Sequence, residues 1–205
     1  MEQYELKNSH LKTETMLEKI SELDQRLFLF LNSFHSDFFD PIVYQFTQTL
    51  PWVPLYIFLS YLIIKTYGTN SWWIFLAVGL TILLADKTTS ALMKPYFERL
   101  RPCRDASLEG LIHHYGNCSG GFSFASSHAA NSFGIATIMT LGISHKYIAV
   151  RWLFLWAVLF SYNRIYLGVH YPGDVMAGAI VGILSGSVSF YIFRIINQKV
   201  QIYKK

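Results

Sequence analysis

Long apolar runs separated by short polar segments dominate the chain. Several of these runs approach the roughly 20 residues that an α-helix needs to cross a bilayer. Pro51 and Pro54 interrupt the first run and predict a kink or an early break there. The sequence therefore predicts an all-α, polytopic membrane helical bundle with about five transmembrane helices, over residues 41–67, 72–93, 129–144, 148–165 and 171–196.

The fifth run carries a stripe of small residues. Gly178, Gly182 and Gly186 recur at four-residue steps, with Ser185 and Ser189 beside them. This spacing allows two membrane helices to approach closely. We interpret the stripe as helix packing and not as cofactor binding.

The region before the first run is more polar. Residues 1–19 carry mixed charges and predict a polar N-terminal tail, without the apolar middle and cleavage site of a signal peptide. Over residues 20–39, apolar side chains recur at three- and four-residue steps, which predicts an amphipathic helix too polar to span. Such a helix lies either in the membrane interface or against the bundle. The predicted membrane domain covers residues 20–197, and a basic C-terminal tail covers 198–205.

Composition agrees with a membrane protein. The chain is 52% hydrophobic and 15% charged, whereas a soluble domain averages about 25% charged residues. The net charge of +4 would hint weakly at nucleic acid in a soluble protein. Here we attribute it to cytoplasmic lysines and arginines and to an anion-binding site. The expected partners are the lipid bilayer and a membrane lipid, with no nucleic acid and no obligate protein partner.

The predicted spans also fix which polar segments share a face. The end of the second run, the start of the third, the end of the fourth and the start of the fifth lie on one side. The charged residues in the short connections and tail of the opposite side are all basic: Lys65, Lys146, Arg151, Lys199, Lys204 and Lys205. The positive-inside rule places that basic side in the cytoplasm. The long loop over residues 94–127 is then outside, or periplasmic in a bacterium, and the expected location is the inner (plasma) membrane.

Three polar clusters fall on the outer side, and each also has a purely structural explanation. Lys94 and Arg101 end the second run and are seven residues apart, so they can share a helix face; alternatively they reach up to lipid phosphates. Asp86 and Lys87, earlier in the same run, either form structural pairs inside the bundle or support a site.

Ser126, Ser127 and His128 open the third run. Serines before an apolar run are good N-caps, and a helix N-terminus attracts phosphate through its free N–H groups and partial positive charge. His128 would lie in the first turn, able to donate a proton. The alternative is a serine cap beside a histidine with no chemical role.

Arg164, His170 and Asp174 form the third cluster. Asp174 in a first helical turn is an ordinary helix-start signal. At this spacing it can also accept the Nδ1–H of His170 and leave Nε2 free as a nucleophile. No grouping of carboxylates or histidines on the outer side suits a metal, so no metal is expected.

Cys103 and Cys118, the only cysteines, both lie in the outer loop. A bridge across 15 residues would stabilise the fold by about 3 kcal/mol on a chain-entropy model, and an outward loop is an oxidising location. The alternatives are two free thiols, or a metal site that includes His113 and His114.

Taken together, the motifs Lys-x6-Arg-Pro, Ser-x-His and Arg-x5-His-x3-Asp resemble those of the type 2 phosphatidic acid phosphatase superfamily, which includes bacterial acid phosphatases and vanadium haloperoxidases. The motifs cover residues 94–174, and the order of spans is similar over nearly all of residues 20–197. Ala125 and Ser127 stand where Pro and Gly are common, and Asn163 where Ser is common. The Ser127 change is expected to alter slightly the backbone amides that face the phosphate.

The resemblance implies a mechanism without metal or cofactor. His170 attacks phosphorus and forms a phosphohistidine, while Asp174 holds its tautomer. His128 protonates the leaving oxygen and then activates water. The positions matching the phosphate-binding residues are Lys94, Arg101, Ser126, Ser127 and Arg164.

The first hypothesis is therefore an integral membrane hydrolase of a lipid phosphate or diphosphate, with undecaprenyl diphosphate, phosphatidylglycerophosphate or phosphatidate as first choices. A lipid A phosphatase of the same mechanism is the alternative. A vanadate-dependent haloperoxidase and a non-catalytic lipid transporter or binding protein are the other two classes; five spans argue against the first and an intact histidine pair against the second.

Overall fold

The computed structural model describes the backbone of residues 2–203 and the side chains of residue 16 and residues 18–198. Within these residues every long element is a helix, and the only strand-like pairing is one isolated bridge between Leu100 and Phe122. The α-helices are α1 Glu2–Asn32, α2 Asp40–Phe46, α3 Val53–Tyr67, α4 Ser71–Asp86, α5 Lys94–Phe97, α6 Ser127–Ile143, α7 Leu153–Tyr166 and α8 Pro172–Tyr203. The predicted all-α class is confirmed.

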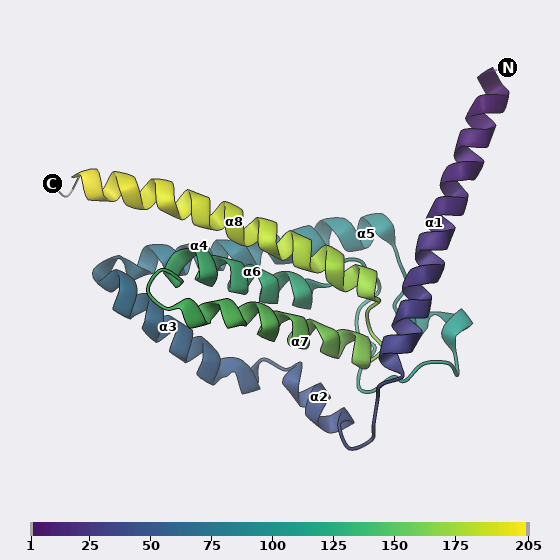
Figure 1. The fold of residues 1–205 in the computed structure, drawn as a ribbon, viewed down its shortest axis with the longest axis horizontal. Coiled ribbons are helices and arrows are strands. Elements are labelled where there is room, and N and C mark those ends of the chain that lie inside the picture. Colours follow the sequence, from purple (N-terminus) through teal and green to yellow (C-terminus); the bar gives the residue numbers. More distant parts are fainter. Residues whose placement is uncertain (1, 204–205) are drawn as a thin grey trace.

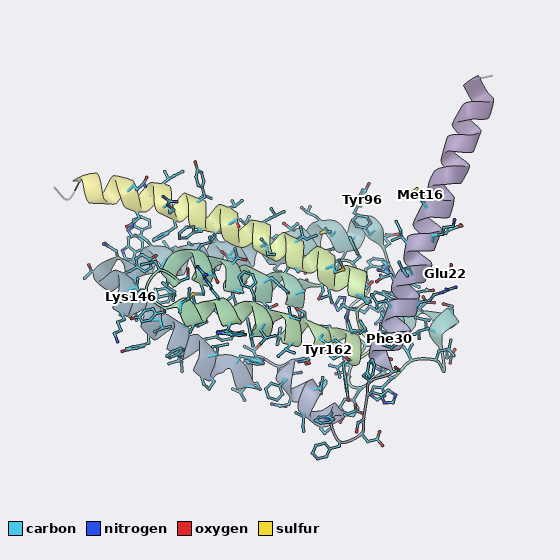
Figure 2. All side chains as sticks on the ribbon, in the orientation of Figure 1. Met16, Glu22, Phe30, Tyr96, Lys146 and Tyr162 are labelled. Atoms are coloured by element: carbon cyan, nitrogen blue, oxygen red, sulfur yellow. A yellow bond between two sulfur atoms is a disulfide. The ribbon has the colours of Figure 1, made fainter. Side chains whose placement is uncertain are left out.

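The bundle consists of α3, α4, α6, α7 and α8, and α1 crosses one end of it (Figure 1; side chains are drawn in Figure 2). Three helical stretches are long and apolar enough to cross a membrane: Leu50–Phe97, Ile148–Tyr166 and Pro172–Gln198. The first folds back at Gly68, whose φ is 53°, so α3 and α4 run antiparallel. The 17-residue α6 corresponds to the predicted third run and lies between α7 and α8. Large apolar side chains such as Ile57 and Leu159 remain exposed on the outside, as lipid-facing residues would.

The first predicted run is broken, as its prolines suggest. α2 ends at Phe46, a short 3₁₀ turn covers Leu50–Trp52, and α3 then begins. Pro51 and Pro54 each occupy one of the first two positions of a helical segment. These positions have no intrahelical partner for an N–H group, so proline is tolerated there.

The amphipathic segment over residues 20–39 is not one helix, because α1 ends at Asn32. Its last turns pack on the end of the bundle, where Phe28 is fully buried while Leu23 stays exposed. The side-chain amide of Asn32 donates to the carbonyls of Ile165 and Tyr166 at 3.0 and 2.9 Å. Both carbonyls lie in the last turn of α7, where carbonyls have no partner four residues further on in the helix; the Ile165 carbonyl also accepts from the N–H of Gly168 at 3.0 Å. Asn32 thus fixes this end of α1 to the end of α7.

Glycines allow α6 and α8 to pack closely, which confirms the packing interpretation of the glycine stripe. A Cβ on Gly182 would collide with the carbonyl of Ala130 and lie 2.9 Å from the backbone N of Gly134. Gly186 meets the Gly134 carbonyl in the same way, at 2.8 Å. The two backbones are therefore in direct contact along this seam.

We predict that Gly182→Ala lowers the stability of the protein by about 1–3 kcal/mol, because the added methyl overpacks the α6–α8 contact. Thermal unfolding in detergent measures the effect. Gly79→Ala in α4 is the matched control, since a Cβ there meets nothing within 4 Å. Equal melting temperatures for the two variants would contradict the close-packing account.

Candidate active site

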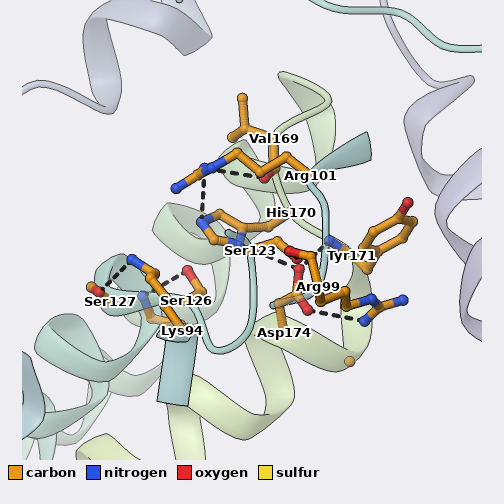
Figure 3. A network of polar contacts seen from close by, with 12 residues as sticks. Lys94, Arg99, Arg101, Ser123, Ser126, Ser127, Val169, His170, Tyr171 and Asp174 are labelled. Carbon is orange, nitrogen blue, oxygen red and sulfur yellow. Dashed lines mark hydrogen bonds and ion pairs between the residues drawn. The ribbon is translucent and has the colours of Figure 1, made fainter. Parts of the chain in front are cut away.

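The three predicted clusters meet at the end of the bundle that α1 crosses (Figure 3). The spacing of Lys94 and Arg101 would allow them to share a helix face, but they do not share a helix. A π-helical segment, Lys87–Met93, leads into α5, which ends at Phe97, and Glu98 is left-handed with φ 46°. The chain then runs extended to Arg101. This reversal, and not helical periodicity, brings Arg101 back toward the site.

The loop that carries His170 is fixed by the end of α7. The backbone N–H groups of Val169 and His170 both donate to the carbonyl of Arg164, at 3.1 and 3.2 Å. Gly168 makes the turn with φ 71°, and a Cβ there would lie 2.6 Å from the carbonyl of His113. Only glycine combines this φ with such a close approach.

His170 lies buried between an acid and a cation (Figure 3). Its Nδ1 is 3.4 Å from Oδ2 of Asp174, and its Nε2 is 3.4 Å from Nη1 of Arg101. A guanidinium can only donate. Nε2 must therefore accept, which leaves the ring hydrogen on Nδ1, facing Asp174. This is the tautomer that a nucleophilic Nε2 requires.

Burial lowers the pKa of His170 to about 4, with Asp174 opposing that effect and Arg101 and Arg164 adding to it. The imidazole is therefore neutral at neutral pH. A neutral ring keeps its lone pair for reaction. Burial also lowers the pKa of Arg101.

Two arginines present unsatisfied donors at the site. Arg101 donates from Nη1 to the carbonyl of Val169 at 3.2 Å, yet its Nε is buried without a hydrogen-bond partner among the described residues. The Nε of Arg164 is likewise buried without a hydrogen-bond partner among the described residues. Buried donors are nearly always paired. An anion between these two side chains would supply the missing acceptors.

Lys94, the third cation of the site, lies beside the start of α6. Its Nζ donates to Oγ of Ser127 at 3.0 Å, and that hydroxyl also contacts Oγ1 of Thr89 at 2.9 Å. Thr89 belongs to the π-helical segment that precedes Lys94, so this segment contacts the start of α6 through the same Ser127 hydroxyl.

Ser126 is the N-cap of α6, as its position predicts. Its Oγ accepts from the N–H of Ala129 at 3.5 Å, and its own N–H donates to the carbonyl of Asp174 at 2.9 Å. The second bond joins the first turn of α8 to the start of α6. The N-terminus of α6, which favours anions, thus lies next to the His170–Asp174 pair.

His128 follows in the first turn of α6, stacked on Phe160 with ring centroids 5.9 Å apart. It interacts electrostatically with Arg164, His170, Lys94 and Arg101. It also lines two cavities, of about 250 and about 270 Å³. The second is polar and includes Arg164, whereas the first continues between the helices.

The first cavity joins polar groups to an aromatic wall. Its remaining lining includes Asp86, Asn131, Trp52 and Trp156. Asp86 makes no ion pair with Lys87 in the described part of the chain; it accepts from the hydroxyl of Ser90 at 3.1 Å. Of the two explanations for this intramembrane acid, the position favours support of the site.

Comparison with known proteins identifies the family. The family model described as PAP2 superfamily matches residues 70–198. The chain belongs to the PAP2 superfamily. It is 37% identical over 194 residues to the lipid A 4'-phosphatase of Bacteroides thetaiotaomicron, covering 91% of this chain and 84% of that protein.

Two solved PAP2 structures resemble it. The crystal structure of Aquifex aeolicus LpxE has a TM-score of 0.57 at 30% identity, covering 82% of this chain and 95% of that one. A transmembrane PAP2-type phosphatidylglycerolphosphate phosphatase from Bacillus subtilis has a TM-score of 0.63 at 20% identity, with 89% and 88% covered. The latter supports the fold alone.

Sequence reasoning missed two residues of this PAP2 site. Arg99 forms ion pairs with Asp174 at 2.9 Å and with Asp24 of α1 at 2.7 Å. Asp24 also accepts from the backbone N of Gly173 at 2.8 Å. Arg99 sits two residues before a predicted site residue, but no spacing rule relates Asp24 to a helix 149 positions away.

The long loop between α5 and α6 is fastened to the site. Cys103 and Cys118 form a disulfide with Cα atoms 6.2 Å apart, and the N–H of Cys103 donates to the carbonyl of Gly168 at 3.1 Å. His114 places a ring nitrogen within 4.8 Å of both sulfurs. Sulfurs bonded to each other are not the thiolates that a metal binds, so the structure favours the bridge over a Cys/His metal site.

We predict that the double variant Cys103→Ser/Cys118→Ser loses up to about 3 kcal/mol of stability, because the open loop gains entropy when unfolded. Phosphatase activity should also fall, since the loop holds the Gly168–His170 turn. Melting temperature and activity in detergent, with and without reductant, check this. The variant has no thiol and should not respond to reductant; an unchanged melting temperature on reducing the native protein would argue against the bridge.

Proposed function

We propose that this membrane lipid phosphatase hydrolyses a phosphate monoester of lipid A, or of a glycolipid of that chemistry, through a phosphohistidine on His170, and releases inorganic phosphate. The observation that carries the chemistry is His170 itself, which is buried and neutral and whose Nε2 faces Arg101; the buried Nε atoms of Arg101 and Arg164 have no hydrogen-bond partner among the described residues. The Bacteroides relative supports the choice of lipid.

In the first step Nε2 of His170 attacks phosphorus. A nitrogen–phosphorus bond forms as the bond to the lipid oxygen breaks, and His128 gives that oxygen its proton. Asp174 accepts the Nδ1–H and stabilises the positive ring of the phosphohistidine. This division of roles is that of a nucleophile with an orienting acid and a separate general acid.

In the second step His128, now neutral, takes a proton from water. The water oxygen attacks phosphorus, the nitrogen–phosphorus bond breaks, and inorganic phosphate leaves His170 neutral again. Lys94, Arg101 and Arg164 hold the equatorial oxygens through both steps, with the Ser126 hydroxyl and the first amides of α6 near Ser127. Phosphoryl transfer depends mainly on such positioning and charge stabilisation.

Several observations favour a lipid over the alternatives. Exposed apolar side chains surround the bundle, and aromatic residues line the first cavity together with His128. A halide-oxidising enzyme needs neither feature. A binding protein needs no buried nucleophile.

The site is proposed to face the periplasm from the inner membrane. Lys65 and Lys146 lie together at the far end of the bundle, where Nζ of Lys146 donates to the carbonyl of Lys65 at 2.9 Å. The positive-inside rule puts that end in the cytoplasm. We further propose that residues 20–197 are the phosphatase domain and that the flanking segments are tails.

We predict that the purified protein releases phosphate from lipid A faster than from undecaprenyl diphosphate, phosphatidylglycerophosphate or phosphatidate in matched detergent micelles. His170→Ala should have no activity on any of them, while His145→Ala, an exposed histidine at the opposite end, should match the native protein. Mass spectrometry of the lipid should show loss of one HPO₃ unit. Activity retained by His170→Ala would overturn the mechanism; a faster diphosphate or glycerolipid reaction would overturn the lipid assignment alone.

We predict that EDTA leaves the rate unchanged, because three fixed cations supply the charge that a metal would otherwise provide. Phosphate release in a metal-stripped buffer, with and without added magnesium, measures this. Inorganic vanadate, an anion with the shape of the transition state, should inhibit competitively in the same buffer. A strict requirement for magnesium would contradict the proposed charge balance.

A further inference from the structure

The carboxylate of Asp174 is fully buried and makes more contacts than its role toward His170 needs. Oδ2 faces Nδ1 of His170 and also accepts from the N–H of Tyr171 at 2.9 Å. Oδ1 faces away from His170 and pairs with Nη1 of Arg99 at 2.9 Å. Each oxygen thus has its own partners, and the plane of the carboxylate is fixed from both sides (Figure 3).

Arg99 is itself held from several directions. Its guanidinium lies over the ring of Tyr171, 3.8 Å from the centroid, and its backbone carbonyl accepts from the N–H of Ser123 at 2.8 Å. A stacked, doubly paired guanidinium loses little further freedom when it binds a carboxylate. Arg99 is therefore a preorganised support and not a surface arginine that happens to be near.

The last member of the chain comes from α1. Oδ2 of Asp24 pairs with Arg99 at 2.7 Å, and Oδ1 accepts from the N–H of Gly173 at 2.8 Å. A Cβ on Gly173 would lie 2.7 Å from Oδ2 of Asp24, so glycine is what lets this acid reach the start of α8. Asp24 therefore acts on both Arg99 and the helix that carries Asp174.

This arrangement solves an electrostatic problem. A buried carboxylate is costly unless it is paired, and an unopposed one beside His170 would draw a proton onto the ring. Arg99 takes up part of the Asp174 charge on the side away from His170. Asp24 then offsets the charge of Arg99, so that a further cation does not compete with the phosphate-binding ones.

We propose that Arg99 and Asp24 are positioning residues for the reaction, and that α1 takes part in catalysis by holding the Asp174–His170 pair in its reactive geometry. The inference rests on the proposed role of His170. Neither residue touches the phosphate; both act through Asp174.

The test compares Arg99→Gln and Asp24→Asn with the native protein, using lipid A in detergent micelles. We expect kcat to fall by about 10- to 100-fold for Arg99→Gln. This is the range typical of metal sites when a residue that orients a ligating side chain without touching the metal is lost. The KM should change little, because the phosphate contacts remain. Asp24→Asn should show a smaller fall of the same kind, and the double variant should be no worse than Arg99→Gln, since both changes break one chain of contacts.

Matched controls separate this from general damage. Glu22→Gln and Arg26→Gln remove an exposed acid and an exposed arginine of α1 that, among the described residues, form an ion pair with each other; both should keep the native kcat. Arg99→Lys should keep more of the native kcat than Arg99→Gln, because lysine retains the positive charge but lacks the forked guanidinium. Melting temperatures identify any variant that misfolds, and Asp24→Asn, which keeps the Arg99–Asp174 pair, decides the matter if Arg99→Gln does not fold.

Native kcat in both Arg99→Gln and Asp24→Asn, or a rise in KM alone, would overturn the inference. Additive losses in the double variant would also overturn it, because independent effects are not one chain. If His170→Ala is active, the proposed function fails instead, whatever the Arg99 variants do.

Discussion

The buried carboxylate of Asp174 is the constraint on which the site depends. A carboxylate with no exposed surface needs a partner for each oxygen, and here the partners come from separate parts of the chain. His170 and Tyr171 belong to the turn before α8, Arg99 to the segment after α5, and the backbone carbonyl of Asp174 accepts from Ser126 at the start of α6. Satisfying one residue thus brings together all three motif segments.

Close helix packing makes that arrangement possible. The bond from Ser126 to Asp174 requires the first turns of α6 and α8 to be adjacent, and the glycine seam of Gly178, Gly182 and Gly186 holds the two backbones in contact below it. Rigid elements hold reacting groups more accurately than loops do. The small-residue stripe therefore serves the chemistry indirectly, by fixing where the α6 N-terminus meets His170.

The sequence was sufficient for features set by local rules. The apolar runs predicted the helices, the position of Ser126 predicted the N-cap of α6, and the spacing of His170 and Asp174 predicted their contact. It was insufficient where distant segments meet. Two helical turns separate Lys94 and Arg101 on paper, yet the left-handed Glu98 ends the helix between them. Asp24 could not be recognised as a site residue within the amphipathic pattern of its segment. Its contact with Arg99 depends on where α1 crosses the bundle, and long-range packing determines that position.

The charges at the site also separate two kinds of recognition. In the proposed mechanism Lys94, Arg101 and Arg164 bind the phosphate whatever lipid carries it, and phosphate oxygens would supply acceptors to the buried Nε atoms of the two arginines. Discrimination among lipids must therefore come from groups that the phosphate does not reach. His128 lines two cavities: the polar cavity around Arg164, and the cavity that also includes Asp86, Asn131, Trp52 and Trp156. A wall that combines polar groups with aromatic faces suits a headgroup carrying hydroxyls and amides better than a bare polyprenyl chain. With the phosphate contacts and the lipid contacts made by separate groups, catalysis and substrate choice can change independently.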